Sequence, residues 1–364
     1  MKVLLLSAYD AGSHKHWRRG LVEAIPDWQW TVLTLPPRYF SWRIRGNSLS
    51  WGRGEDAAEL RQPWDLIVAT SMTDLSALRG LVPEIARVPT VVYFHENQFA
   101  YPRSKDAFQS VEPQLLNIYT ALCADLLLFN SEFNRRTLLD GARRLLKRFP
   151  DCVPTGVCEE VEGKSRVLPV PVENDLFQPG SSRAELPEET LVITWAARWE
   201  YDKGPERLLQ ILDGLVERGI GFRLNLLGES FRNSPAEFEE IRRRFGQQLQ
   251  ALGYQASTEA YRQLLGGSHV FLSTAHHEFQ GLAVMEACAL GCSPLVPDEQ
   301  AYPDYYPAQC RYGSVGEAVN RLTALAEVAK LRRPLPQVDM SPLCWSRLAG
   351  EYRRWLARTA ERSS

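Results

Sequence analysis

The feature that most constrains this fold is a series of short, continuous apolar runs separated by stretches with helical periodicity. Such runs are typical of strands buried on both faces of a parallel sheet. They lie at Lys2–Ala8, Trp30–Leu35, Leu66–Ala69, Thr90–Phe94, Leu126–Asn130 and Val167–Pro169. Helical patterns between them, for example His16–Ile25 and Pro113–Ala124, complete the prediction of a doubly wound α/β domain.

A second series of the same kind follows a linker-like change of composition near residues 171–190. This stretch is marked by Pro171, Asn174, Asp175, Pro179, Gly180, Ser181, Ser182 and Pro187. Strands are then predicted at Val192–Ala197, Phe222–Leu227, Val270–Ser273 and Ser293–Val296. Helices are predicted at Pro205–Glu217, Pro235–Ala251, Thr258–Leu265, Leu282–Leu290 and Trp345–Arg358. We therefore predict domains over residues 1–175 and 185–338, followed by a helical segment over 339–364.

Charge and cysteine content limit the possible partners and compartment. The formal net charge of -2 gives no global basic field of the kind that attracts nucleic acid, although residues up to 170 carry a small excess of Lys and Arg. Seven cysteines without paired spacing favour reduced thiols in a cytoplasmic protein. No signal-peptide pattern or membrane-spanning apolar run is present, so we expect no integral membrane association. Adjacent His276 and His277 rarely face one centre, so we expect no metal site.

The strongest candidate site is the segment from Glu278 to Glu286, which follows a predicted strand and opens a helix. Gly281 and Leu282 stand at the helix start, where free amides and the helix dipole favour a phosphate. The two carboxylates can bind sugar and ribose hydroxyls. The alternative is an ordinary acid pair on a solvated helix.

A second candidate site follows the first strand of the C-terminal domain. Arg198 and Lys203 lie there, at the strand end where open α/β sheets bind ligands. Two fixed cations can hold a diphosphate and stabilise its charge as it leaves. The alternative is surface ion pairing with Glu200 or Asp202.

Polar segments also follow two strands of the N-terminal domain. Gly12 lies in a loop that matches neither the dinucleotide motif nor the P-loop. His95 follows the strand Thr90–Phe94 together with Asn97 and Gln98. A histidine there can bind a sugar hydroxyl, or it can be structural.

Basic and aromatic residues gather in two N-terminal segments. Arg143, Arg144 and Lys147 lie on a predicted amphipathic helix, and Trp42 and Arg43 lie where aromatic and basic residues interleave. Aromatic side chains stack on bases and cations bind phosphates, while membrane surfaces also attract basic helices. A solvated helix face and a packed Trp-rich loop are the alternatives.

Together these motifs resemble a known family. Glu278–Glu286, Arg198 and Lys203-Gly204 are similar to the E-x7-E element and the diphosphate-binding pair of retaining GT-B glycosyltransferases of the glycosyltransferase 4 type. Val170–Glu173 and Phe177–Pro179 resemble that group's interdomain segment without its usual Asn-Gly. Other segments resemble the tRNA-queuosine alpha-mannosyltransferase family: Leu5–His14, Trp17, Leu33–Pro37, Trp42-Arg43, Tyr93–Gln98, Tyr101-Pro102 and Phe129–Asn134.

The resemblance implies an α/β, GT-B fold of two Rossmann-like doubly wound domains facing a central cleft. The first domain would take the acceptor, the second would bind the nucleotide sugar, and the last helix would pack back towards the first. It also implies retaining transfer of mannose from GDP-mannose, the co-substrate, to queuosine at the wobble position of tRNA-Asp, with no cofactor or metal.

The same resemblance implies roles for individual residues. Arg198, Lys203, Gly281 and Leu282 would hold the diphosphate, Glu278 the sugar and Glu286 the ribose. Gly12 and His95 would approach the transferred sugar. Acceptor or tRNA contacts would come from Asn97, Gln98, Trp42, Arg43, Arg143, Arg144 and Lys147.

Three other functions remain compatible with the residues. One is the same fold acting on a lipid or polysaccharide acceptor. Another is a glycoside hydrolase with Glu278 and Glu286 as paired carboxylates, in which Arg198 and Lys203 would have no role. The third is a non-catalytic RNA-binding protein that kept the fold.

Overall fold

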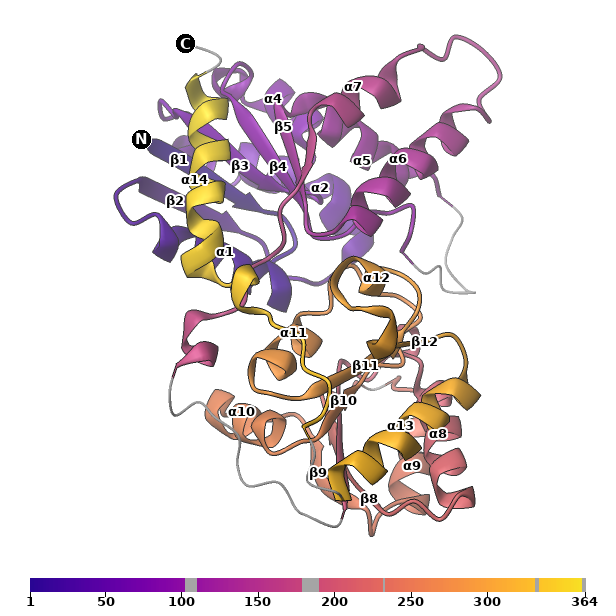
Figure 1. Ribbon diagram of the computed structural model, residues 1–364. Coiled ribbons are helices and arrows are strands. Elements are labelled where there is room, and N and C mark those ends of the chain that lie inside the picture. Colours follow the sequence, from indigo (N-terminus) through magenta and orange to yellow (C-terminus); the bar gives the residue numbers. More distant parts are fainter. Residues whose placement is uncertain (102–109, 179–189, 232, 331–333, 362–364) are drawn as a thin grey trace. The chain divides into compact units, whose positions relative to one another are not determined.

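The computed structural model describes residues 1–101, 110–178, 190–231, 233–330 and 334–361 (Figure 1). The chain forms two compact units, Met1–Pro171 with Trp345–Ser364, and Val172–Cys344. None of the helices in the described part combines the length and apolar character needed to cross a bilayer. All seven cysteines are free thiols. Most of the residues predicted as linker, from Pro179 to Pro187, lie outside the described ranges, as does Pro102.

The first unit contains a parallel six-stranded sheet in the order β2-β1-β3-β4-β5-β6. Its strands are β1 (Lys2–Ser7), β2 (Gln29–Thr34), β3 (Leu66–Thr70), β4 (Thr90–Phe94), β5 (Leu126–Phe129) and β6 (Ser165–Val167). Its helices are α1 (Gly12–Ala24), α2 (Phe40–Arg53), α3 (Ala57–Leu60), α4 (Leu75–Leu81), α5 (Glu112–Cys123), α6 (Glu132–Leu146), α7 (Val157–Gly163) and α14 (Trp345–Glu361). Every residue of β3 and β4 is buried, as the continuous apolar runs predict.

The second unit repeats this architecture in the order β12-β11-β10-β7-β8-β9. Its strands are β7 (Leu191–Ala196), β8 (Phe222–Leu227), β9 (Leu249–Gly253), β10 (Val270–Leu272), β11 (Ser293–Pro297) and β12 (Arg311–Tyr312). Its helices are α8 (Pro205–Glu217), α9 (Ala236–Arg244), α10 (Thr258–Gly266), α11 (Leu282–Ala289), α12 (Tyr302–Tyr305) and α13 (Val315–Lys330). The strand order reverses between β1 and β3 in the first sheet and between β7 and β10 in the second. Ligands bind open α/β sheets at such switch points.

The sequence prediction differs from the structure in several elements, and it placed neither α13 nor β12. The helix predicted over Pro235–Ala251 ends at Arg244, and Leu249–Gly253 is an edge strand beside β8. An edge strand is half-buried, so its apolar residues alternate and do not form the continuous run used to find the other strands. Helix α2 was not predicted, because its buried face includes Gly46, Asn47 and Ser48, which disguise the apolar pattern.

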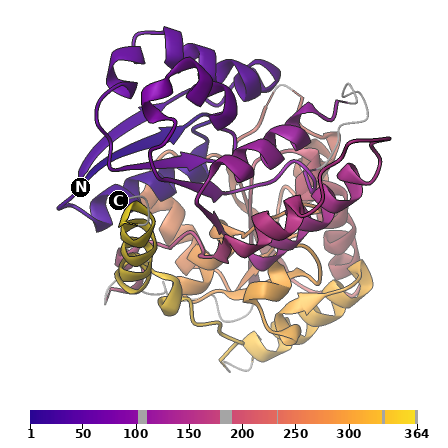
Figure 2. The ribbon, with the colours of Figure 1, turned by 90° about the horizontal axis from the view of Figure 1, so that it is seen from above.

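Helix α14 completes the first unit from the far end of the chain. It packs against α1, β3 and β4, and both ribbon views show it beside α1 (Figures 1 and 2). The indole of Trp17 donates a hydrogen bond of 3.1 Å to the Tyr352 hydroxyl, which donates to the Pro169 carbonyl at 2.9 Å. Trp345 lies over Gly20, where an added Cβ would come within 2.2 Å of its ring.

Replacing Tyr352 by Phe should lower the free energy of unfolding by about 1–3 kcal/mol, because it leaves the buried indole N–H of Trp17 without its partner. Denaturant unfolding measures this change. Tyr119→Phe is the matched control, since Tyr119 is 50% exposed and should tolerate the loss of its hydroxyl. Equal stability of the two variants would contradict an energetic role for this hydrogen bond.

Candidate active site

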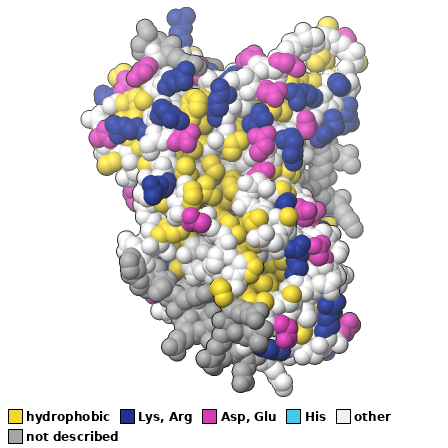
Figure 3. Space-filling view, in the orientation of Figure 1, with side chains coloured by type: hydrophobic (Ala, Val, Ile, Leu, Met, Phe, Trp, Pro, Cys, Tyr) yellow, Lys and Arg dark blue, Asp and Glu magenta, His cyan; other side chains and the backbone are white. Residues whose placement is uncertain are grey.

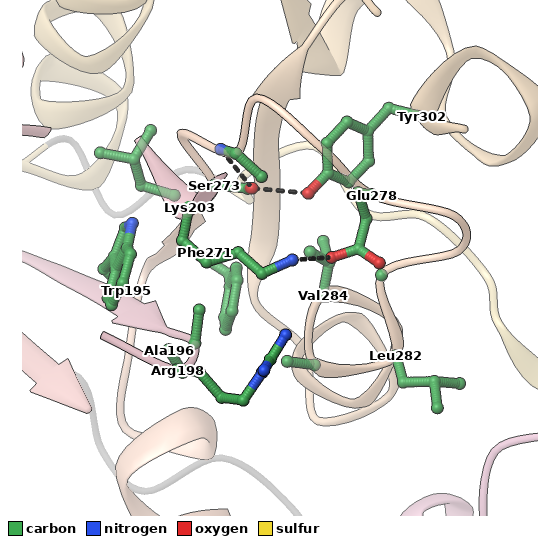
Figure 4. A pocket seen from close by; sticks show the side chains of 15 residues that line it. Trp195, Ala196, Arg198, Lys203, Phe271, Ser273, Glu278, Leu282, Val284 and Tyr302 are labelled. Atoms are coloured by element: carbon green, nitrogen blue, oxygen red, sulfur yellow. Dashed lines mark hydrogen bonds and ion pairs between the residues drawn. The ribbon is translucent and has the colours of Figure 1, made fainter. Parts of the chain in front are cut away.

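A pocket of about 130 Å³ lies at the switch point of the second sheet (Figure 4). The loops that leave β7 and β10 meet here, because these strands are neighbours and their carboxyl ends share one edge. Arg198 and Lys203 come from the first loop, and Glu278, Gly281 and Leu282 come from the second loop and the start of α11. The structure thus brings together five of the predicted donor-site residues.

Lys203 is the electrostatic centre of this pocket. Its ammonium nitrogen lies 3.3 Å from Asp202 Oδ2 and 3.4 Å from Glu278 Oε2, and it donates to the His277 carbonyl at 3.0 Å. Burial disfavours its charge, but Glu278 and Asp202 outweigh that effect and raise the pKa of Lys203. Burial likewise disfavours a charged Glu278, but Lys203 prevails and lowers the pKa of that carboxyl. Both groups are therefore charged at neutral pH.

The backbone around Lys203 is fixed by close packing. The Lys203 carbonyl accepts a hydrogen bond from Thr274 Oγ1 at 2.8 Å, and this hydroxyl oxygen accepts one from the Trp195 indole at 2.9 Å. Gly204 has φ +64°, and an added Cβ would lie 2.1 Å from the Thr274 carbonyl oxygen. Only glycine fits this approach, so the Lys203-Gly204 pair is a geometric requirement of the site.

The start of α11 offers free hydrogen-bond donors to the pocket. Gly281 precedes the helix with φ +83°, and its carbonyl accepts from the amides of Val284 and Met285. The amides of Leu282 and Ala283 have no hydrogen-bond partner in the part of the chain that the structure describes. Free amides at a helix N-terminus favour an anion, and here they line the same pocket as Lys203.

Arg198 and Glu286 are held differently from Lys203 and Glu278. Arg198 is half-exposed and forms an ion pair of 2.8 Å with Glu200. Glu286 does not line the pocket, and it accepts a hydrogen bond from Tyr261 of α10 at 3.4 Å. Burial, with a further contribution from Glu286, raises the pKa of Tyr261 well above its ordinary value. Tyr261 therefore stays protonated and donates to the carboxylate.

His95 belongs to a buried aromatic cluster at the carboxyl end of β4. Its ring lies 4.2 Å from the His14 ring and 5.1 Å from the Trp17 ring, centroid to centroid. Neither His95 ring nitrogen has a hydrogen-bond partner among the described residues. Burial, with the neighbouring His14, lowers the pKa of His95 well below its ordinary value. His95 is thus a neutral ring that can still donate and accept a hydrogen bond.

His14 forms an ion pair with Glu96, with 3.1 Å between Nε2 and Oε2. Ser71 donates a hydrogen bond to the other Glu96 oxygen at 3.1 Å. The sequence prediction placed His14 and Glu96 in two polar loop segments without a role of their own, and it began the first helix at His16. Starting the helix at Gly12 places His14, Trp17 and Leu21 on one buried stripe, a signal that was present in the sequence. Gly12 itself is exposed at the start of α1.

The structure argues against acceptor contacts by two predicted residues. Asn97 is fully buried: its amide donates to Asn134 and Thr137, and its carbonyl oxygen accepts from the amides of Phe99 and Ala100. These hydrogen bonds occupy both polar atoms of the Asn97 side chain and hold its own loop in place. Arg43 is 8% exposed on the inner face of α2, which leaves little surface for binding a phosphate.

Gln98 and Trp42 remain accessible. Gln98 is partly buried and donates to the Met72 sulfur at 3.6 Å, while its backbone amide donates to Asn117. Trp42 is 51% exposed.

The basic face of α6 is partly neutralised. Arg143 pairs with Glu162 of α7 at 2.6 Å and with Asp140 at 3.4 Å. Arg144 and Lys147 are exposed and have no ionic partner within the described ranges. Both signs of charge are also interspersed over the face drawn in Figure 3.

The chain is similar to known proteins along most of its length. Residues 2–172 match the family described as tRNA-queuosine alpha-mannosyltransferase N-terminal, and residues 181–308 match Glycosyl transferases group 1. A tRNA-queuosine alpha-mannosyltransferase of Drosophila melanogaster is 31% identical over 337 residues, covering 91% of this chain and 88% of its own. This chain belongs to that family. It is therefore a glycosyltransferase, and the hydrolase interpretation is wrong.

Members of other glycosyltransferase groups share the fold or part of the sequence. A GDP-mannose:cellobiosyl-diphosphopolyprenol alpha-mannosyltransferase of Xanthomonas oryzae is 26% identical over 206 residues, about half of each chain. Sucrose-phosphate synthase of Thermosynechococcus elongatus aligns with a TM-score of 0.72 at 16% identity, over 98% of this chain and 100% of its own. Anabaena HepE in complex with UDP and glucose aligns with a TM-score of 0.65 at 15% identity, also over 98% of this chain and 100% of its own. With two parallel six-stranded sheets, this likeness confirms the GT-B fold.

The pKa values of His14 and His95, whose rings meet edge to face, should lie on opposite sides of 6.5. His14 is held above that value, because Glu96 outweighs the effect of burial, and His95 is held well below it. A folded-state pKa above the unfolded value means that the His14–Glu96 pair stabilises the fold below about pH 6.5. That contribution disappears as pH rises through the folded-state pKa.

Histidine Cε1–H shifts in an NMR titration measure both pKa values. Glu96→Gln should bring the pKa of His14 down while that of His95 stays low. An unchanged pKa of His14 in this variant would contradict the ion pair.

Proposed function

We propose that this protein transfers mannose from GDP-mannose to queuosine at the wobble position of tRNA-Asp, with retention of anomeric configuration. The observation that carries the proposal is the 31% identity to a tRNA-queuosine alpha-mannosyltransferase along nearly the whole of both chains. The name of the Xanthomonas oryzae relative specifies GDP-mannose, which supports the same donor here. A tRNA acceptor would place the protein in the cytoplasm.

The pocket supplies the chemistry that such a transfer requires. In the reaction the bond from the anomeric carbon to the phosphate oxygen breaks, and negative charge accumulates on the leaving diphosphate. Preorganised cations and amides aimed at that charge are the largest source of such catalysis. We assign this task to Lys203, Arg198 and the free amides at Leu282 and Ala283. Glu278, which is already charged and oriented by Lys203, would bind sugar hydroxyls.

The same arrangement supports transfer without a metal. A metal ion in other nucleotide-sugar enzymes neutralises the diphosphate, and two cations with a helix N-terminus can do so here. The described residues hold no cluster of three or more His, Cys, Asp or Glu side chains that could bind a metal ion. Glu286, through its hydrogen bond with Tyr261, is our candidate for the ribose. Gly12 and His95 remain predicted contacts of the transferred sugar.

A transfer assay with labelled GDP-mannose tests donor, acceptor and reaction type together. We expect label in a tRNA pool that contains queuosine and none in a pool that lacks it. EDTA should leave the rate unchanged, and abolition of transfer by EDTA would overturn the metal-free mechanism. Label in neither pool would reject the donor or the acceptor and would favour a lipid or polysaccharide acceptor, to be tested with other nucleotide sugars.

Replacing Lys203 by Ala should reduce turnover by a factor of roughly 100 or more, as loss of one preorganised donor does elsewhere. Lys330→Ala is the matched control, because Lys330 is an exposed lysine of the same unit, paired with Glu327. A thermal melt separates loss of catalysis from loss of fold. Full turnover in a folded Lys203→Ala variant would remove Lys203 from the diphosphate site.

A further inference from the structure

Three aromatic side chains stand exposed at the start of α2, and we call them the aromatic ledge. Tyr39 is 72% exposed, Phe40 39% and Trp42 51%. Removing any of these rings from water would lower the free energy of the system. All three nevertheless lie in solvent within a stretch of four residues. An exposed aromatic cluster of this kind marks a surface that meets a partner.

The backbone holds the ledge in place at a cost. Tyr39 has φ +54°, a left-handed conformation that bulky residues rarely adopt. Its carbonyl accepts hydrogen bonds from the amides of Trp42 and Arg43, so this turn is also what begins the helix. Trp42 lies over Gly46, where an added Cβ would be 2.5 Å from its ring. A glycine would relieve the strain at position 39, so the tyrosine ring there points to a binding role.

The ledge is continuous with the candidate site of the first unit. The Phe40 ring meets the Tyr9 ring edge-on, with 6.1 Å between centroids. Tyr9 follows β1 directly, at the switch point of the first sheet, and leads into the loop that carries Gly12 and His14. A molecule lying on the ledge would therefore extend from the edge of the sheet where His14, Glu96 and His95 gather.

The ledge segment is basic in sequence, since residues 36–53 carry Arg38, Arg43, Arg45 and Arg53 and no carboxylate. Arg43 is buried, and Arg45 pairs with Asp74 at 2.9 Å and with Glu112 at 3.7 Å. Arg38 is therefore the cation of this segment that lies beside the exposed rings. The Arg38 guanidinium lies 5.7 Å from the centre of the Tyr39 ring. Flat rings beside an exposed guanidinium suit a ligand that has both flat faces and phosphates.

We propose that the aromatic ledge stacks unpaired bases of a single-stranded polynucleotide next to the acceptor nucleoside, while Arg38 binds the adjoining phosphate. The proposal rests on the proposed function, in which the acceptor is a nucleoside of tRNA. Proteins recognise single-stranded RNA through stacking of splayed bases on aromatic rings. A lipid surface fits less well, because Ile44 and Trp51 of α2 face the protein interior and Leu49, 49% exposed, is the large apolar side chain that α2 exposes beyond the ledge.

The decisive variant is Tyr39→Gly, which removes the ring and suits the left-handed backbone. Its thermal midpoint should equal or exceed that of the wild type, while affinity for a queuosine-containing anticodon stem-loop should fall about tenfold or more. Trp42→Ala should weaken binding similarly, and Trp42→Phe should restore most of it. Tyr119→Ala, at an exposed tyrosine of α5 in the same unit, should bind as the wild type does.

Three further arms separate the possible failures. The affinity for GDP-mannose, measured by calorimetry, should be the same in Tyr39→Gly as in the wild type. Fully paired RNA should bind wild type and variant equally, because its bases are not free to stack. If both Tyr39→Gly and Trp42→Ala bind the stem-loop tightly and transfer mannose to it, the proposed role of the ledge in base stacking is wrong, but the proposed function stands. Failure of the wild type to bind any stem-loop, with ledge-dependent binding to anionic vesicles, would overturn both.

Discussion

The ammonium group of Lys203 joins the two loops that line the pocket of the second unit. It lies between Asp202, in the loop after β7, and Glu278, in the loop after β10, and it also donates to the backbone of the second loop. The tight packing of Gly204 against Thr274 holds the lysine backbone at that distance. A buried cation with two carboxylates is stable only while all three stay together, so the ion cluster and the shape of the pocket are maintained by the same contacts.

This arrangement also prepares the pocket for an anion. Without a diphosphate, Lys203 is balanced by its two carboxylates, and the amides at the start of α11 remain free. A bound diphosphate would bring its own negative charge to Lys203, and Glu278 would then be released towards sugar hydroxyls. The positive groups would need little rearrangement, which is the condition under which electrostatic stabilisation is most effective.

Strands and motifs whose residues lie close together along the chain could be predicted from the sequence. Pairs of residues that only the strand order of the sheet brings together were missed. Buried strands such as β3 and β4 were predicted because short, continuous apolar runs are typical of strands covered on both faces. The segments that carry Lys203 and Glu278 could be located because each lies in one loop between a strand and a helix, and their role in binding a donor stays a prediction. The His14–Glu96 pair was missed because its members come from α1 and from the loop after β4, which approach each other only through strand order.

Two of the candidates for acceptor contact are buried in the structure. Arg43 was a candidate because aromatic and basic residues interleave around it, and Asn97 because it follows a strand together with His95 and Gln98. Their positions on an inner helix face and within a hydrogen-bonded loop cannot be read from composition. The ledge residues Tyr39 and Phe40 show the converse, since the sequence pattern fits a packed loop as well as a binding surface and the structure exposes them.

The placement of α14 has a consequence for folding during synthesis of the protein. Residues 1–171 leave the ribosome first, but the unit they form lacks the helix that covers Trp17 and Tyr93 until residues 345–361 have been made. The unit synthesised first is therefore the last to be completed, although domains usually fold in the order of synthesis. A chain that stops before residue 345 would leave this aromatic surface uncovered.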